Sequence, residues 1–313
     1  MRDNVVIIGC GNMGRWHLLS CSRSPEVEKI FCYDPRPVES ELRDFFSKWN
    51  ISPQMVNLEG DLKTVLNRID PRTIVIIAST AAGRSVLMPQ VLEHKPLAVL
   101  CEKPLAQKQS EYERIRCWSQ ETGVPVYINF SRRAFDFYRR IQEDLKGRTE
   151  KIFCACLARG LACNGIHLLD LAVWLFSTQT YTFLSSQRGE VFPLRHQGFF
   201  DVTGEMLIRL DDNDLLVIKA VQDTAVASLN ILASGKEYKI YETESKMIAF
   251  DGAKQWDVQN ISIVPTSVLT AQVVEDIRQG RCPRLPDIHD AYLAHRILFD
   301  FLSQHGLAEL NIT

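Results

Sequence analysis

The chain has little net charge and no long hydrophobic run. Its 313 residues include 36 basic and 38 acidic side chains, which gives a formal net charge of -2. Because the charges nearly cancel, the protein has no strong electrostatic field that would attract nucleic acid or an anionic membrane. We therefore expect neither as a partner. No apolar stretch approaches the length of a membrane span. The opening Met1-Arg2-Asp3-Asn4 runs straight into an apolar strand without room for a signal peptide, and we therefore expect a cytoplasmic protein that acts on small molecules.

Cysteines at metal-binding or redox spacing are also missing. The nine cysteines are an odd number, and no two of them form a CxxC pair. Several fall inside apolar segments, as is typical of reduced, buried thiols in a reducing compartment. Cys154 and Cys156 share one face of a predicted strand near Cys163 and His167, but this spacing matches no known zinc pattern. The sequence therefore predicts no metal site.

At its start the chain carries a glycine-rich turn behind an apolar strand. Residues 9–14 read Gly-Cys-Gly-Asn-Met-Gly and follow the run at 5–8. In a dinucleotide-binding turn the three glycines allow the tight turn, the approach of backbone to a pyrophosphate, and the packing of helix on strand. The helix that begins there points free N–H groups and its positive dipole end at the pyrophosphate. The predicted cofactor-binding residues of this turn are Gly9, Cys10, Gly11, Asn12, Met13 and Gly14.

Asp34 ends a second apolar stretch, residues 29–33, twenty residues beyond Gly14. A carboxylate at this place would accept hydrogen bonds from the hydroxyls of the adenosine ribose. The same carboxylate would repel a 2′-phosphate, so the sequence favours NAD(H) as the cofactor. Arg36 lies two residues on and could receive that phosphate if its loop turned inward, so NADP(H) stays open.

Apolar strands and helices alternate up to about residue 128. Strands without polar interruption between helices indicate a parallel sheet that is covered on both faces. We therefore predict an α/β protein whose residues 1–128 form a Rossmann domain, a doubly wound parallel sheet of six strands. Ser79 and Thr80 follow the strand at 73–78, at the edge where such sheets bind ligands, and are predicted to contact the cofactor. The further elements expected here are strands at 97–101 and 124–128 and helices at 40–49, 61–69, 83–94 and 110–122.

Residues 129–313 predict a second, α+β domain for substrate binding and oligomerisation. Short strand-like stretches separated by turn signals fit the hairpins of a mainly antiparallel open sheet. An exposed sheet face usually needs a cover, so we expect a homo-oligomer through this sheet. The expected strands are 152–158, 181–186, 204–210, 215–221, 227–232 and 237–241, and the expected helices are 135–145, 166–176, 267–279 and 287–305.

Two residues have the chemistry to move the proton of a hydroxyl group. Lys103, in Glu102-Lys103-Pro104 after a strand, can hydrogen-bond a substrate hydroxyl and stabilise its alkoxide, or it is a surface lysine that caps the next element. His167 suits acid–base work because imidazole titrates near neutral pH. Asp170 lies three positions on, on the same helical face, where it could orient the ring. Lys103 and His167 are therefore the candidates for this chemistry, whereas His17 is interpreted as helix packing.

The segments Gly9–Gly14, Glu102–Pro104 and Gly165–Asp170 together make the chain similar to the Gfo/Idh/MocA family of NAD(P)-dependent oxidoreductases. The resemblance covers essentially the whole chain and implies Lys103 and His167 as catalytic residues, with Glu102 and Lys103 along the cofactor. It implies hydride transfer between nicotinamide and a hydroxyl or carbonyl of a sugar, sugar acid or nucleotide sugar, in polysaccharide or nucleotide-sugar biosynthesis. The substrate contacts that it and the local chemistry suggest are Asn129, Arg132, Arg133, Cys163, Asn164, His167 and Asp170.

One position departs from that family. Many active members carry an aspartate four residues before the histidine, where this chain has Cys163. Two alternatives therefore stay open. The chain could be a non-catalytic NAD-binding regulator, or an enzyme that uses bound NAD transiently without net redox.

Overall fold

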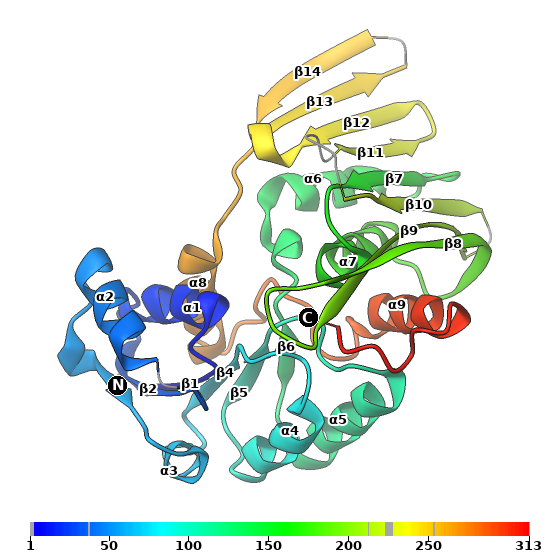
Figure 1. The fold of residues 1–313 in the computed structure, drawn as a ribbon. Helices are drawn as coiled ribbons and strands as arrows, with labels where there is room; N and C mark the ends of the chain where they lie inside the picture. Colours follow the sequence, from blue (N-terminus) through cyan, green and yellow to red (C-terminus); the bar gives the residue numbers. More distant parts are fainter. Residues whose placement is uncertain (1–2, 37, 212, 223–227, 253, 313) are drawn as a thin grey trace. The chain divides into compact units, whose positions relative to one another are not determined.

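The computed structural model describes residues 3–36, 38–211, 213–222, 228–252 and 254–312. The chain forms two compact units (Figure 1). The first comprises Met1–Ser131 with Val264–Asp290, and the second Arg132–Ile263 with Ala291–Thr313. The sequence analysis placed residues 264–290 in the second domain, 129–313, whereas in the structure they belong to the first unit. They do so because α8 (Thr266–Arg278) packs on α1 (Asn12–Ser22), and the Ala271 N–H donates to Ser20 Oγ over 2.8 Å.

A six-stranded parallel sheet forms the core of the first unit, in the order β3-β2-β1-β4-β5-β6. All four residues of β4 and all four of β5 are buried, as their unbroken apolar sequences require. The predicted doubly wound sheet is confirmed, although its short strand β3 was not among the expected ranges. The strands are β1 (Asp3–Ile8), β2 (Val27–Tyr33), β3 (Val56–Leu58), β4 (Ile74–Ile77), β5 (Ala98–Cys101) and β6 (Val126–Ile128).

Helices cover both faces of this sheet. Figure 1 shows α1, α2 and α8 on one face and α4 and α5 on the other. An aromatic cluster ties α2 to α1, since the Trp16 ring meets Phe45 and Trp49 edge-on, with centroids 5.7 and 5.4 Å away. The further helices are α2 (Glu39–Trp49), α3 (Leu62–Leu66), α4 (Arg84–Glu93) and α5 (Gln109–Thr122).

The second unit contains an eight-stranded sheet in the order β14-β13-β12-β11-β7-β10-β9-β8. The pair β7–β10 is parallel, and the other strand pairs among the described residues of this sheet are antiparallel, which confirms the expectation of a mainly antiparallel sheet. The strands β13 and β14 were not predicted, and residue 227 of the expected strand at 227–232 lies outside the described residues. The bounds are β7 (Ile152–Leu157), β8 (Tyr181–Pro193), β9 (Phe200–Leu210), β10 (Asp214–Ala220), β11 (Ser228–Ala233), β12 (Lys236–Tyr241), β13 (Lys246–Asp251) and β14 (Lys254–Asn260).

Three helices, α6 (Asp136–Leu145), α7 (Ile166–Phe176) and α9 (Tyr292–Gln304), lie on the same side of this sheet (Figure 1). Nearly every residue of α7 is buried because α6, α9 and β10 all contact it. The predicted helix 287–305 begins only at Tyr292, since the Asp287 carboxylate accepts the N–H groups of His289 and Asp290 and closes a turn there. Among the described residues, no helix combines the length and hydrophobicity that crossing a bilayer requires.

Candidate active site

The glycine turn between β1 and α1 has the shape that a dinucleotide requires. Gly9 has φ +97°, and a Cβ there would lie 2.4 Å from the Ser79 backbone nitrogen. A Cβ on Gly14 would lie 1.9 Å from the Gly9 carbonyl oxygen, so helix and turn touch through glycine. Gly11 caps α1 without a side-chain hydrogen bond, which leaves the first N–H groups of the helix for an anion. This donor set fits a pyrophosphate.

Asp34 lies beside this turn and is bound to it. Its Oδ2 accepts the Cys10 N–H over 2.8 Å, and Arg36 donates to the same carboxylate from its backbone N and its Nε, both over 3.0 Å. Burial acts to raise the pKa of Asp34, but the hydrogen bonds from Arg36 and Cys10 outweigh it and hold the pKa below its usual value. The structure therefore brings the predicted residues Cys10, Asp34 and Arg36 together.

A buried arginine, Arg84, connects the backbone segments that follow β4 and β5. Arg84, 2% exposed, donates through its guanidinium to the carbonyl oxygens of Ser79, Glu102 and Pro104, the last over 2.6 Å. Ser79 and Thr80 are thus at the predicted edge, and the backbone on both sides of Lys103 is held. The sequence analysis missed Arg84, because an arginine at a helix start gives no signal of burial.

Glu102, which the sequence analysis expected along the cofactor, belongs to a buried polar network. Its carboxylate is buried, with Oε1 2.9 Å from His17 Nε2 and accepting a hydrogen bond from Asn129 Nδ2 over 2.6 Å. The other ring nitrogen of His17 lies 2.8 Å from Thr270 Oγ1 in α8. Burial alone would raise the pKa of Glu102, but His17, with further contributions from Lys103 and Asn129, lowers it to about 2. His17 is therefore part of a buried polar network and not only a packing residue.

In the second unit the two predicted arginines are paired with carboxylates. Arg132 donates through Nε and Nη2 to Glu242 over 2.7 and 2.6 Å, and the Tyr138 hydroxyl donates to the same carboxylate. Arg133 donates in the same bidentate way to Asp170 over 2.9 and 2.6 Å, in a fully buried pair. Both arginines, which the sequence analysis expected to contact the substrate, thus bind protein carboxylates in this structure.

Asp201 in β9 organises the π-helical turn Leu161–Gly165 that leads into α7 and His167. Its carboxylate accepts the N–H groups of Ala162 and Cys163 over 2.9 and 3.2 Å. Burial raises the pKa of Asp201 in spite of these bonds. Cys163 and Asn164 are therefore placed by a carboxylate from a distant strand, which the sequence analysis did not find.

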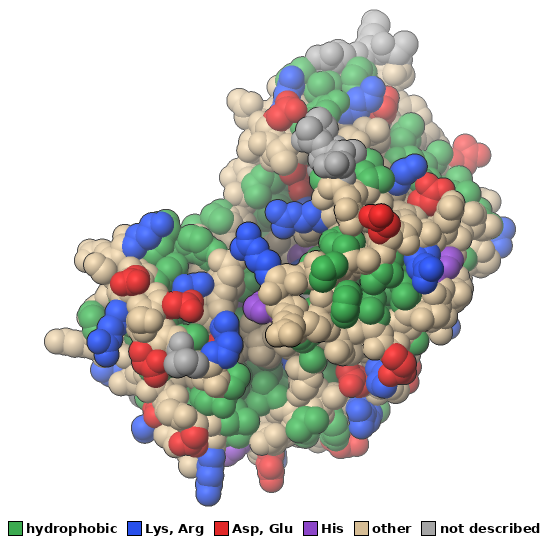
Figure 2. Space-filling view, in the orientation of Figure 1, with side chains coloured by type: hydrophobic (Ala, Val, Ile, Leu, Met, Phe, Trp, Pro, Cys, Tyr) green, Lys and Arg blue, Asp and Glu red, His purple; other side chains and the backbone are tan. Residues whose placement is uncertain are grey.

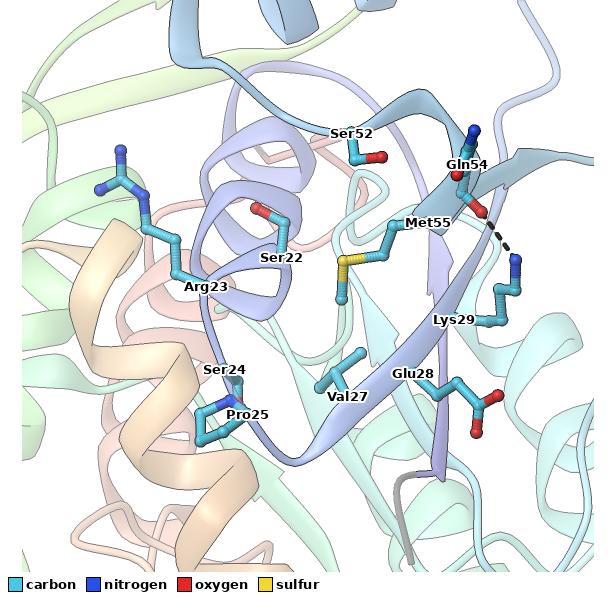
Figure 3. Close-up of a pocket in the computed structure, with 10 residues that line it drawn as sticks. All are labelled: Ser22, Arg23, Ser24, Pro25, Val27, Glu28, Lys29, Ser52, Gln54 and Met55. Atoms are coloured by element: carbon cyan, nitrogen blue, oxygen red, sulfur yellow. Dashed lines mark hydrogen bonds between the residues drawn. The ribbon is translucent and has the colours of Figure 1, made fainter.

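Two other surface features do not overlap the predicted site. A pocket of about 480 Å³ lies between the end of α1 and the start of β2, lined by residues such as Arg23, Lys29 and Met55 (Figure 3). Figure 2 shows basic and acidic side chains interspersed over the visible surface, as the balanced charge predicts. Within the described ranges, no group of three or more His, Cys, Asp or Glu side chains is arranged to hold a metal ion.

Comparison with solved structures shows the same fold across the whole chain. An oxidoreductase domain protein from Kribbella flavida superposes with a TM-score of 0.79 at 16% identity, covering 98% of each chain. UDP-N-acetylglucosamine 3-dehydrogenase GnnA from Acidithiobacillus ferrooxidans gives 0.76 at 12% identity, covering 98% of this chain and 99% of that one. Levoglucosan dehydrogenase in complex with NADH and levoglucosan gives 0.76 at 15%, covering 99% and 98%.

The sequence comparisons agree with the glycine turn. No curated protein matches the chain. Residues 4–130 match the family described as an oxidoreductase family with an NAD-binding Rossmann fold. The prediction of an NAD-type cofactor is thereby confirmed, and the first unit holds the residues that fit it. This match confirms the resemblance to the Gfo/Idh/MocA family of NAD-binding oxidoreductases over residues 4–130.

Proposed function

We propose that this protein is an NAD(P)-dependent oxidoreductase that acts on a CH–OH group, with Lys103 as a catalytic residue. One observation carries the proposal. Lys103 lies two residues beyond the end of β5, at the carboxyl edge of the sheet, where a Rossmann fold binds its ligand. Buried Arg84 holds the carbonyl groups of Glu102 and Pro104 on either side of it. The lysine side chain therefore extends from a fixed piece of backbone, as precise positioning of a reacting group requires.

The chain's own residues supply the proton chemistry. When bound, the dinucleotide provides the nicotinamide ring that takes or gives the hydride. Lys103 donates a hydrogen bond to the substrate hydroxyl, and its charge favours the alkoxide. His167, the second residue of α7, takes the hydroxyl proton or returns it. Asp170 and Arg133 anchor that helix to the turn Ser131–Ala134, so the proposed role of Asp170 is to position His167.

For the substrate we propose a sugar, a sugar acid or a nucleotide sugar. Two proteins that share this fold are named for such compounds, a UDP-N-acetylglucosamine dehydrogenase and a levoglucosan dehydrogenase. Arg132 and Arg133 add support, because their bidentate ion pairs fix the polar turn Ser131–Ala134. A rigid polar turn suits contact with a ligand that has many hydroxyl groups.

The test is a comparison of Lys103→Ala with Lys108→Ala, a change at an exposed lysine five residues on. NAD+ and NADP+ are screened against sugars, inositols and nucleotide sugars by absorbance of the reduced cofactor. We expect Lys103→Ala to lower turnover at least about 100-fold, the usual scale for a lost acid–base group. Binding of NADH, read by fluorescence, should stay within about threefold. Lys108→Ala should match the wild-type protein.

Other outcomes identify the alternatives. Unchanged turnover in Lys103→Ala contradicts the assignment of Lys103. Product without net NADH indicates a transient use of the cofactor. Tight cofactor binding with no product from any compound points to a regulator.

We also propose that the protein associates with copies of itself through the second sheet. Leu207, Val217 and Cys154 lie in one cross-strand row of β9, β10 and β7, and each is only half-buried. Their chain neighbours, such as Ile208 and Ile218, are fully buried, on the side that the helices cover. An apolar row on a sheet face that none of the described helices covers is stabilised by association, with exposed Glu205, Arg209 and Lys219 at its margins.

A further inference from the structure

The turn Leu161–Gly165 and the first turn of α7 present one partly exposed face. Among residues 161–170, those that are not buried are Cys163, Asn164 and His167. Cys163 and His167 are four positions apart, so their side chains lie on the same side of this helical segment. A ligand that reaches the imidazole of His167 from solvent therefore also meets the thiol of Cys163.

Asp201 lies behind this face and binds both the backbone and the thiol of Cys163. Its carboxylate, in a residue only 1% exposed, accepts the N–H groups of Ala162 and Val202 at Oδ1 over 2.9 and 2.8 Å. At Oδ2 it accepts the Cys163 N–H over 3.2 Å, and the Cys163 thiol makes a further hydrogen bond to the same carboxylate. Glycine at position 160 permits this approach, because a Cβ there would lie 2.0 Å from the carboxyl carbon.

The direction of the hydrogen bond between the thiol and Asp201 follows from the charge of the carboxylate. Burial raises the pKa of Asp201, and the backbone N–H groups oppose this rise because they stabilise the ionised form. An ionised carboxylate can only accept hydrogen bonds, so the thiol of Cys163 is the donor. Its proton therefore points inward at Asp201, and the sulfur lone pairs are left for a partner on the exposed side, where sulfur is a weak acceptor.

We propose that Asp201 is a positioning residue that makes Cys163 a hydrogen-bond acceptor for a hydroxyl group of the substrate. The sulfur binds a second hydroxyl beside the one whose proton His167 moves, and the pair thus selects compounds with hydroxyl groups on neighbouring carbons. The inference rests on the proposed function, because it takes the face that carries His167 as the substrate side.

Four variants separate the direction of this hydrogen bond from its mere presence. Cys163→Ser keeps a donor to Asp201 and an outward acceptor, whereas Cys163→Ala removes both. Asp201→Asn can place an amide N–H where Oδ2 was, and this donor turns the thiol around so that its proton points outward. Adding Cys163→Asp to Asp201→Asn restores an outward acceptor, because a carboxylate accepts from the amide and from the ligand.

Steady-state kinetics with a compound that the wild-type protein turns over provide the test. We expect kcat/KM to fall about tenfold in Cys163→Ala and in Asp201→Asn, the scale of one lost hydrogen bond, while NADH binding stays within about twofold. The loss should be below about threefold in Cys163→Ser, and the double variant should regain most of the turnover lost in Asp201→Asn. An Asp201 that only supports the fold could not be replaced in this way.

Asp214→Asn is the matched control for the change at Asp201. Asp214 is also a carboxylate of this sheet that accepts a backbone N–H, from Lys151 over 2.8 Å. It pairs with Leu210, at the opposite end of β9 from Asp201. Its variant should leave kcat/KM unchanged. Thermal unfolding of every variant identifies any that is not folded at the assay temperature.

A second measurement needs no substrate. Iodoacetamide reacts with thiolates, and peptide mass spectrometry gives its rate at Cys163 relative to exposed Cys117. A carboxylate beside a thiol disfavours the thiolate, so Asp201→Asn should raise the relative rate at Cys163 at least about fivefold. Asp214→Asn should leave that rate unchanged.

Two results would overturn the inference. One is an Asp201→Asn variant with unchanged kinetics and unchanged alkylation of Cys163, and the other is a folded double variant that regains no turnover. If the wild-type protein turns over none of the compounds, the proposed function fails. The alkylation rates then decide on the pair of Asp201 and Cys163, which an unchanged rate in Asp201→Asn refutes and a raised rate supports.

Discussion

Replacing Glu102 by glutamine should lower the free energy of unfolding of the first unit, and the lowered pKa of this buried carboxylate gives the size of the effect. Glu102 is 6% exposed, and its pKa lies at about 2 against an ordinary 4.5. At about 1.36 kcal/mol for each pKa unit, that difference gives about 3 kcal/mol of stability at pH 7. His17 and Asn129 both contact Oε1, so glutamine can keep an amide oxygen at that place. The variant therefore keeps an acceptor there and loses the charge.

The dependence on pH identifies the cause. A carboxyl group whose pKa is lowered on folding contributes stability that is complete above about pH 4.5 and is lost as the pH falls toward 2. Calorimetric unfolding of wild type and Glu102→Gln at pH 7 should differ by about 6–12 °C in the melting temperature of the first unit. At pH 3 the difference should be much smaller.

A control and a contrary result complete this experiment. Glu59→Gln removes a carboxylate that pairs with exposed Arg68, and it should change stability by less than about 1 kcal/mol at either pH. The reasoning is refuted if Glu102→Gln melts with wild type at pH 7, or if its deficit is the same at pH 3.

The remaining predictions concern the second unit. Gly160→Ala should lower the free energy of unfolding by about 1–3 kcal/mol, because the new Cβ would lie 2.0 Å from the carboxyl carbon of Asp201. The control Gly60→Ala should leave the stability nearly unchanged, because a Cβ at Gly60 has no atom within 4 Å. Equal stability of the two variants would contradict the tight contact. Val217→Glu should lower the mass of the protein in solution measured by light scattering, because it places a charge in the half-buried row that Val217 forms with Leu207 and Cys154. The control Val86→Glu, at an exposed position of α4, should leave the mass unchanged. An unchanged mass in Val217→Glu would argue against association through this face.

Local patterns were the predictable part of this protein. The glycine turn, Asp34 and Lys103 are each defined by a few neighbouring residues and by the strand before them, and the structure places all of them at one edge of the first sheet. Helix α7 begins and ends at the residues that its apolar sequence indicated. The edge strand β14 was missed because polar residues interrupt it, and three-residue β3 because it is too short for a pattern.

Long-range pairs account for what the sequence did not reveal. His17 lies 85 residues from Glu102 and 253 from Thr270, so nothing near it in sequence distinguishes it from a packing histidine. Arg133 has its partner 37 residues away, which is why its fork was expected to be open to a substrate. Asp201 likewise acts on a turn 38 and 39 residues earlier. In each case the missing information is the three-dimensional partner.

The return of α8 to the first unit affects the order in which the protein folds during translation. A ribosome releases the chain from its N-terminus, and domains usually fold as they emerge. Here the hydrogen-bond partners of Ser20 and His17 are Ala271 and Thr270, which are synthesised only after every strand of the second sheet. The cofactor-binding unit is thus the first to be started and cannot be completed until residues 132–263 of the second unit have been synthesised, so the nascent protein passes through a stage in which the α1 face that α8 will cover needs protection from aggregation.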